Sequence, residues 1–176
     1  MTATTQASQP ASQKRSRESL FSGDSIQLHR VIVPIDPTSE AVKGIDSAVG
    51  LVKKYGAEIF LVHVYKEPYS FALVRGPHGY AECEQHRSLV KSALLTLRDR
   101  VRKQYSRCFA IFRRGVDIQS EISAVAKEVK ADLIVVPAHQ PNWLRHLSEG
   151  NDAERIGRES PCPILVVYEG EELQLA

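Results

Sequence analysis

Short runs of consecutive apolar residues alternate with amphipathic stretches through most of this chain, and this alternation limits the fold more than any other feature. A run such as Val31–Ile35 is apolar at every position, which is typical of a parallel strand covered on both faces. The run Cys108–Phe112 is less hydrophobic, so we expect it nearer an edge of the sheet. The predicted strands are Val31–Ile35, Ile59–Val64, Cys108–Phe112, Asp132–Val136 and Ile164–Tyr168.

The stretches between these runs carry apolar residues at helical spacing. In the first stretch, Thr38 or Ser39 can cap the start of a helix, and Gly56 can end it. The predicted helices are Ser39–Tyr55, Glu82–Gln104, Ile118–Val129 and Asp152–Glu159. Strands and helices that alternate in this way predict an α/β domain with a five-stranded, parallel, doubly wound sheet and four helices.

A doubly wound sheet also predicts where a ligand would bind. The usual place is a crevice beyond the carboxyl ends of the strands, at the point where the direction of winding reverses. The residues that follow the predicted strands there are Asp36, Tyr65 and the segment Pro137–Gln140. The fold class by itself does not define the chemistry of that crevice.

The chain divides unevenly into a polar N-terminal tail, one domain and a short acidic C-terminal tail. We interpret residues 1–27 as a mostly disordered, solvated tail, with contact to a partner or an acidic surface through Lys14, Arg15 and Arg17 as the alternative. The domain is predicted to span residues 28–168, and residues 169–176 form the acidic C-terminal tail. A length of 176 residues suits one domain with a substantial core.

Charge, hydropathy and cysteine usage exclude several classes of protein. The chain has 23 Lys+Arg against 21 Asp+Glu, a balance that does not favour nucleic acid as a partner. No apolar run approaches the roughly 20 residues that span a bilayer, and residues 1–25 contain no signal-like apolar segment. Cys83, Cys108 and Cys162 are widely spaced, as reduced thiols are in cytosolic proteins. We therefore expect a cytoplasmic protein that does not associate with a membrane, binds no metal and has no disulfide framework.

Four segments, in a fixed order, carry a family resemblance. They are Val31–Asp36, Leu61–Val64, Ala131–Val136 and Ser160–Val167. Together they resemble the universal stress protein family over nearly the whole of residues 30–167. The resemblance implies a domain similar to the adenine-nucleotide alpha-hydrolases, with strand order 3-2-1-4-5, in a cytoplasmic homodimer. Many members of that family bind ATP, and others do not.

The segment after the fourth predicted strand separates these two groups. ATP-binding relatives are similar there to Gly-x2-Gly-x9-Gly-Ser/Thr, because glycine lets backbone amides approach phosphate oxygens. Counting back from Pro161-Cys162-Pro163, the four motif positions are filled by Pro137, Gln140, Gly150 and Asn151. Only one of three glycines is kept, and proline has no amide hydrogen to donate. The stretch from His139 to Trp143 is also similar to the universal stress protein A subfamily, whose members typically lack nucleotide.

The resemblance carries two sets of site residues onto this chain. Asp36 matches an acidic residue at the adenine or ribose end, with a turn or helix-cap carboxylate as the alternative. Val64 matches a residue whose backbone meets adenine, with a core strand residue as the alternative. The degenerate nucleotide site would comprise Pro34, Asp36, Val64, Pro137, His139, Gln140, Gly150, Asn151 and Asp152. The dimer interface would comprise Pro163, Ile164, Leu165, Val166, Val167 and Tyr168, because an apolar edge strand favours pairing with a second copy.

The remaining candidates favour structural interpretations. We interpret His63 as a buried, hydrogen-bonded histidine rather than a catalytic base, and Cys162 as buried and inert. Asp132 is predicted to begin a strand. The segment Tyr65–Tyr80 is an unusually long connection that either closes over the crevice or, as we favour, packs on a partner subunit. The spacing supports no metal site and no Ser-His-Asp or Cys-His arrangement.

These observations leave three classes of function. We favour a non-enzymatic stress-response homodimer that acts through contacts with an unidentified protein, with no cofactor and weak or absent ATP binding. The alternative is a regulator that binds ATP or another adenine nucleotide, with at most slow hydrolysis. The third class, an enzyme of a related α/β group, would need catalytic residues that the sequence does not reveal.

Overall fold

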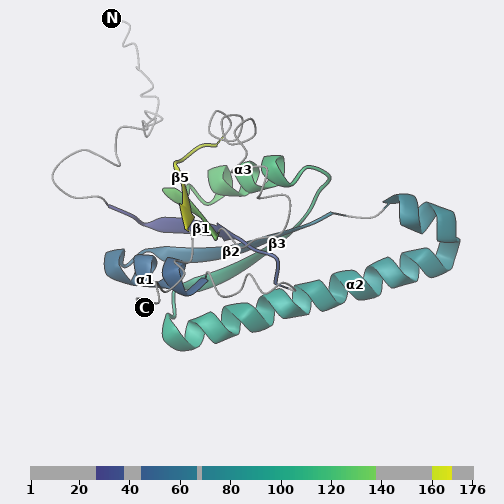
Figure 1. The fold of residues 1–176 in the computed structure, drawn as a ribbon, viewed down its shortest axis with the longest axis horizontal. Helices are drawn as coiled ribbons and strands as arrows, with labels where there is room; N and C mark the ends of the chain where they lie inside the picture. Colours follow the sequence, from purple (N-terminus) through teal and green to yellow (C-terminus); the bar gives the residue numbers. More distant parts are fainter. Residues whose placement is uncertain (1–26, 38–44, 67–68, 138–159, 168–176) are drawn as a thin grey trace, which may run out of the picture.

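The computed structural model describes residues 27–37, 45–66, 69–137 and 160–167. Each predicted strand is present in these residues, with ends that differ by at most two positions (Figure 1). The strands are β1 (Arg30–Pro34), β2 (Glu58–Tyr65), β3 (Cys108–Arg114), β4 (Leu133–Pro137) and β5 (Ile164–Val167). The described helices are α1 (Ile45–Tyr55), α2 (Tyr69–Gln104) and α3 (Ile118–Glu128).

All five strands are parallel and form one sheet in the order β3-β2-β1-β4-β5. β1 lies at the centre, where Val31 pairs with Ile59 of β2 on one side and with Leu133 of β4 on the other. β3 forms one edge, as its lower hydrophobicity predicts, and β5 forms the other. The strand order implied by the family resemblance is therefore confirmed.

Helices cover both faces of this sheet, which is why its strands read as continuous apolar runs (Figure 1). Side chains alternate between the faces along each strand. Val31 and Val33 pack into the core under α1 and α2, together with Leu94. Ile32 points the other way and packs into the core under α3, together with Val125.

Asp132 joins the amino-terminal ends of β1 and β4. Its carboxylate accepts hydrogen bonds from the backbone N–H groups of His29 (2.7 Å) and Arg30 (2.9 Å). Its own N–H donates to the carbonyl of Arg30 at 2.8 Å. Asp132, predicted to begin a strand, directly precedes β4 and links it to a segment about a hundred residues earlier in the chain.

Two helices end in the same backbone motif. After α1, Gly56 adopts a φ of 66°, and the N–H of Ala57 donates to the carbonyl of Val52 at 3.0 Å. After α3, Lys130 adopts a φ of 52°, and the N–H of Ala131 donates to the carbonyl of Ala126 at 2.9 Å. These are the bonds of a Schellman C-terminus, which favours glycine at the left-handed position. The predicted helix end at Gly56 is confirmed.

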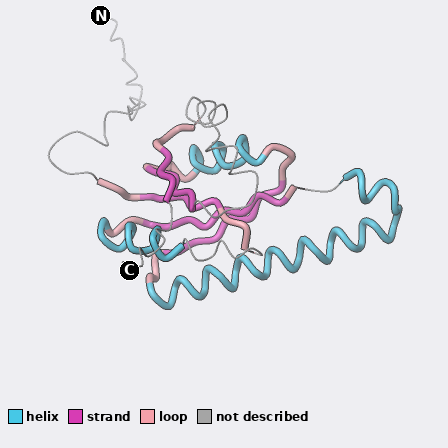
Figure 2. The backbone as a smooth tube through the Cα atoms, in the orientation of Figure 1, coloured by secondary structure: helices cyan, strands magenta, loops and turns pink. Residues whose placement is uncertain are grey.

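The segment Tyr65–Tyr80, expected to be a long loop, is mostly helical, and this prediction was wrong. α2 begins at Tyr69, thirteen residues before the predicted start at Glu82, and continues to Gln104. It contains one non-helical residue, Gly76, with φ 60° and ψ −142°. Figure 2 shows helix on both sides of this break, and the first part of α2 extends beyond the carboxyl ends of β2 and β3. Glycine permits the positive φ, and the proline that follows starts the second part without losing a helical hydrogen bond.

Several predictions lie outside the described residues. These are residues 1–26 of the polar N-terminal tail, the acidic C-terminal tail, the helix start at Ser39 and the predicted helix Asp152–Glu159.

Candidate functional site

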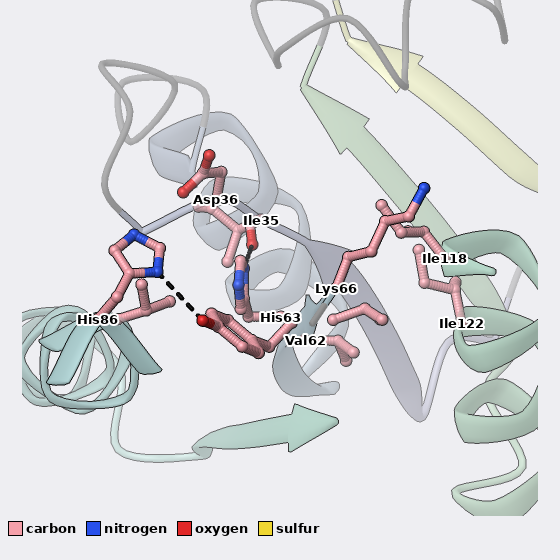
Figure 3. A pocket seen from close by; sticks show the side chains of 11 residues that line it. Ile35, Asp36, Val62, His63, Lys66, His86, Ile118 and Ile122 are labelled. Carbon is pink, nitrogen blue, oxygen red and sulfur yellow. Dashed lines mark hydrogen bonds between the residues drawn. The ribbon is translucent and has the colours of Figure 1, made fainter. Parts of the chain in front are cut away.

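A crevice of about 220 Å³ lies at the carboxyl ends of β1 and β2, between α2 and α3 (Figure 3). It borders the central strand, where the winding of the sheet reverses, which is the position that the fold predicts for a ligand. Its apolar lining consists of Ile35, Val62, Val64, Val90, Ile118 and Ile122. Its polar lining consists of Asp36, His63, Tyr65, Lys66 and His86. An apolar floor with a few converging polar groups is the usual form of a small-molecule site.

Of the residues expected to contact a nucleotide, Asp36 and Val64 line this crevice. Asp36 lies two residues after the end of β1, and its half-buried carboxylate lies at the rim (Figure 3). The end of β1 is held to β2 by a hydrogen bond of 2.8 Å from the N–H of Ile35 to the carbonyl of Val62. Pro34 lies fully buried within β1 and does not line the crevice.

His63 is fixed to β1 by a hydrogen bond. Its Nδ1 lies 2.8 Å from the carbonyl of Ile35, and because a carbonyl only accepts, Nδ1 carries the proton and donates it. Burial lowers the pKa of His63 below its ordinary value, although the bond to Ile35 and the charge of Asp36 oppose this. The ring packs against Phe112 with centroids 5.8 Å apart. The prediction of a hydrogen-bonded histidine agrees with this arrangement, although the side chain is half-buried.

His86 enters the crevice from α2, a placement that was not predicted from the sequence. Its Nδ1 lies 3.3 Å from the hydroxyl of Tyr65, and the two rings are 5.7 Å apart (Figure 3). The hydroxyl of Tyr65 also donates to the carbonyl of Cys83 at 3.3 Å. A signal was present, because His86 precedes the buried Val90 by one helical turn and therefore lies on the inward face of α2.

Lys66 supplies a cation to the same crevice. It directly follows β2, and its exposed side chain extends past the α3 residues Ile118 and Ile122 (Figure 3). The described lining thus combines one carboxylate, one ammonium group and two imidazoles over an apolar floor. Such a set can bind an aromatic ring with polar substituents, and it carries little net charge.

Pro137 is the one phosphate-loop position that the structure describes. It is the last residue of β4, it is buried, and it pairs with Val167 of β5. The other loop positions from the family motif, namely His139, Gln140, Gly150, Asn151 and Asp152, lie outside the described residues.

The expected dimer surface lies on β5, at the edge of the sheet. Leu165 of this strand and Pro163, which precedes it, are exposed, and the other residues of β5 are half-buried. Leu165 is among the large apolar side chains that are exposed, with 42% of its surface accessible. Tyr168, the last residue of the expected interface, lies outside the described residues.

The three cysteines are free thiols. Burial raises the pKa of Cys108 and of Cys162 to about 11 in each case. Cys162 is held by Ser160, whose hydroxyl donates to the carbonyl of Cys162 at 2.6 Å. A thiol with so high a pKa is a poor nucleophile, which agrees with the interpretation of Cys162 as inert.

The described residues offer neither a metal-binding cluster nor a helix that fits a membrane. No group of three or more His, Cys, Asp and Glu side chains in that part of the chain could hold a metal ion. None of the described helices combines the length and the apolar character that crossing a membrane requires.

Comparisons with known proteins agree with this geometry. The model of the universal stress protein family matches residues 27–168. The universal stress protein YxiE of Bacillus subtilis is 26% identical over 149 residues, which cover 80% of this chain and 99% of that protein.

Solved structures of the same family share the fold. The universal stress protein UspA from Lactobacillus plantarum is similar with a TM-score of 0.65 and 18% identity, over 81% of this chain and 99% of that one. A universal stress protein in complex with cAMP is similar with a TM-score of 0.56 and 20% identity, over 81% and 98% of the two chains. Because the family model covers most of the sequence and the strand order agrees, this chain belongs to the universal stress protein family.

Proposed function

We propose that this protein is a non-enzymatic, cytoplasmic regulator of the stress response, whose crevice binds the nucleoside end of an adenine nucleotide and gains little from the phosphates. The crevice lining supports the first part. The carboxylate of Asp36 and the backbone at Val64 offer hydrogen bonds above an apolar floor. A volume of about 220 Å³ lies below the roughly 300–1,000 Å³ of sites that enclose drug-sized ligands, and so suits part of a nucleotide. The solved relative that holds cAMP also binds an adenine nucleotide.

Pro137 is the observation that carries the second part. In ATP-binding relatives, the first glycine of the phosphate loop follows the fourth strand, and Pro137 stands at that position at the end of β4. Proline has no amide hydrogen, and its ring fixes φ. A charge-assisted hydrogen bond to phosphate contributes about 1.5–3 kcal/mol, so the loss of two, at Pro137 and Gln140, weakens binding by about two to four powers of ten.

Titration calorimetry with adenosine and with ATP and Mg²⁺ tests this proposal. We expect adenosine and ATP to bind with similar affinity, and ATP with a dissociation constant above about 10 μM. Asp36→Ala should abolish adenosine binding. Asp46→Ala, which removes an exposed carboxylate from α1, is the matched control and should leave it unchanged.

Tight ATP binding would favour the alternative, a regulator that binds ATP and hydrolyses it slowly at most. A dissociation constant below about 10 μM, or near-stoichiometric ATP in the purified protein, would contradict weak phosphate binding. If the parent does not bind and the Pro137→Gly, Gln140→Gly double variant does not bind either, the missing glycines are not the limiting defect.

We also propose that the protein acts as a homodimer through β5. This strand is an edge of the sheet with an exposed Leu165, and two copies can pair their edges about a twofold axis. Light scattering at tens of micromolar should give the mass of a dimer. Val166→Lys should give a monomer, whereas Val116→Lys, at a position 71% exposed and away from β5, should remain dimeric. A monomeric parent, or a dimeric Val166→Lys variant, would contradict this interface.

A further inference from the structure

Tyr65, at the end of β2, forms a hydrogen-bonded bridge to two groups of α2. Its hydroxyl lies 3.3 Å from the carbonyl oxygen of Cys83 and 3.3 Å from Nδ1 of His86. Cys83 and His86 are three residues apart, so both groups face the same side of the helix. Tyr65 is buried, with 4% of its surface accessible. The ring of Phe112 stacks on the ring of Tyr65, with the two centroids 6.0 Å apart. The phenol is therefore held in place between the two groups of α2.

This bridge determines which nitrogen of His86 carries a proton. The hydroxyl of Tyr65 has a single hydrogen, and it donates that hydrogen to the carbonyl of Cys83. The oxygen of Tyr65 can then only accept from His86, so Nδ1 of a neutral His86 must be the protonated nitrogen. Nε2 is left with a lone pair. In Figure 3 this second nitrogen of His86 lies on the side of the ring away from the dashed hydrogen bond.

His63 has the same tautomer for an independent reason. Its Nδ1–H donates to the carbonyl of Ile35, which leaves Nε2 as an acceptor. Burial lowers its pKa, which favours the uncharged ring. Two imidazoles, on β2 and α2, thus line one crevice, and the Nδ1 atom of each is engaged by a group of the protein. This end of the crevice favours hydrogen-bond donors on a ligand and disfavours carbonyl or phosphate oxygens.

We infer that His86 contacts the ligand and contributes to its selection, with Nε2 accepting a hydrogen bond from an amino or hydroxyl group of the bound nucleoside. Tyr65 is a positioning residue, because it acts by fixing the tautomer of His86. The inference rests on the proposed nucleoside site and adds to it a residue, an orientation and a chemical preference. The donor-bearing part of the ligand lies against α2, and the phosphates lie away from it.

The tautomer can be tested without ligand. Long-range ¹H–¹⁵N correlation spectra of the histidine rings, recorded near pH 8 where an ordinary imidazole is neutral, should show Nδ1 of His86 protonated and Nε2 unprotonated. Tyr65→Phe keeps the buried ring and removes the hydroxyl, so the fixed tautomer should be lost. A wild-type spectrum with Nε2 of His86 protonated would overturn the inference.

The contact is tested with three nucleosides. Adenosine, purine riboside (which lacks the amino group) and 2′-deoxyadenosine (which lacks one hydroxyl) are titrated into the wild type and His86→Phe. The wild type should bind adenosine about two- to tenfold more tightly than the analogue that lacks the recognised donor, and His86→Phe should bind both equally. His78→Phe, at an exposed histidine of α2 outside the crevice, is the matched control and should keep the wild-type preference.

The results separate this inference from the proposed function. Adenosine binding with the same preference in wild type and His86→Phe would overturn the inference and leave the nucleoside site intact. No adenosine binding by the wild type would overturn both. Combining Tyr65→Phe with His86→Phe should weaken binding no further than His86→Phe alone, because Tyr65 acts through His86. A larger loss in the double variant would contradict the positioning role.

Discussion

Replacing Asp132 by alanine should remove the link between the amino-terminal ends of β1 and β4. The carboxylate accepts from the N–H of Arg30 at 2.9 Å, in a half-buried position, and from the N–H of His29 at 2.7 Å, in an exposed one. A charge-assisted bond of the first kind contributes about 1.5–3 kcal/mol, and an exposed bond about 0.5–1 kcal/mol. We therefore expect Asp132→Ala to lower the free energy of unfolding by about 2–4 kcal/mol.

Urea denaturation followed by circular dichroism measures this loss, at one fixed protein concentration because a dimer makes stability concentration-dependent. The melting temperature should fall by roughly 5–15 °C for a domain of this size. Asp132→Asn keeps one side-chain oxygen as a neutral acceptor, so it should lose about half as much.

Asp99→Ala is the matched control. Asp99 is 59% exposed on α2, where it forms an ion pair with Arg98 at 2.7 Å. Such surface pairs contribute at most about 1 kcal/mol, so this variant should be nearly as stable as the parent. Equal losses in Asp132→Ala and Asp99→Ala would refute the argument that Asp132 holds the two strands together.

Three further predictions concern single side chains. Lys130→Gly should raise the free energy of unfolding by about 0.5–1 kcal/mol, because glycine relieves the positive φ at the end of α3, and a destabilised variant would contradict this. Burial lowers the pKa of His63 below 6.5, so the unfolded chain binds a proton at this histidine more readily than the folded chain does. The free energy of unfolding should therefore fall as the pH drops below about 6.5, by at most about 1.4 kcal/mol per pH unit. His63→Phe should flatten this part of the urea-denaturation pH profile, and an unchanged profile would argue against the assignment. Iodoacetamide should alkylate the half-buried Cys83 faster than Cys108 and Cys162, because burial raises the pKa of the latter two thiols to about 11. Peptide mass spectrometry measures the three alkylation rates, and equal rates in the native protein would contradict this prediction.

Local patterns in the sequence were sufficient to predict the sheet. Apolar runs such as Val31–Ile35 are typical of strands covered on both faces, and the weaker run at Cys108 indicated an edge. The end of α1 at Gly56 also followed from the sequence, because a glycine after the last apolar position favours the left-handed conformation. These features depend on neighbours a few residues away, and periodicity reports such neighbours directly.

The start of α2 and the side of the crevice formed by α2 could not be predicted from the periodicity of apolar residues. The segment Tyr65–Tyr80 was interpreted as a connection, because no local rule distinguishes a helix with one sharp bend, here at Gly76, from a break between elements. His86 was missed for a related reason. Its contact with Tyr65 joins positions 21 residues apart and exists only because α2 packs beside the end of β2. Asp36 was found because it immediately follows the predicted strand Val31–Ile35, whose end lies at the crevice.

The central claim is that the crevice at the carboxyl ends of β1 and β2 binds a nucleoside. The most direct test is a titration of the ¹⁵N-labelled protein with adenosine, followed by amide chemical shifts. Saturable shifts are predicted at Asp36, Val64 and Lys66, which line the crevice, and none at Glu58 or Arg107, which lie at the opposite ends of β2 and β3. Unchanged crevice amides at millimolar adenosine, or shifts confined to the opposite end of the sheet, would contradict the account.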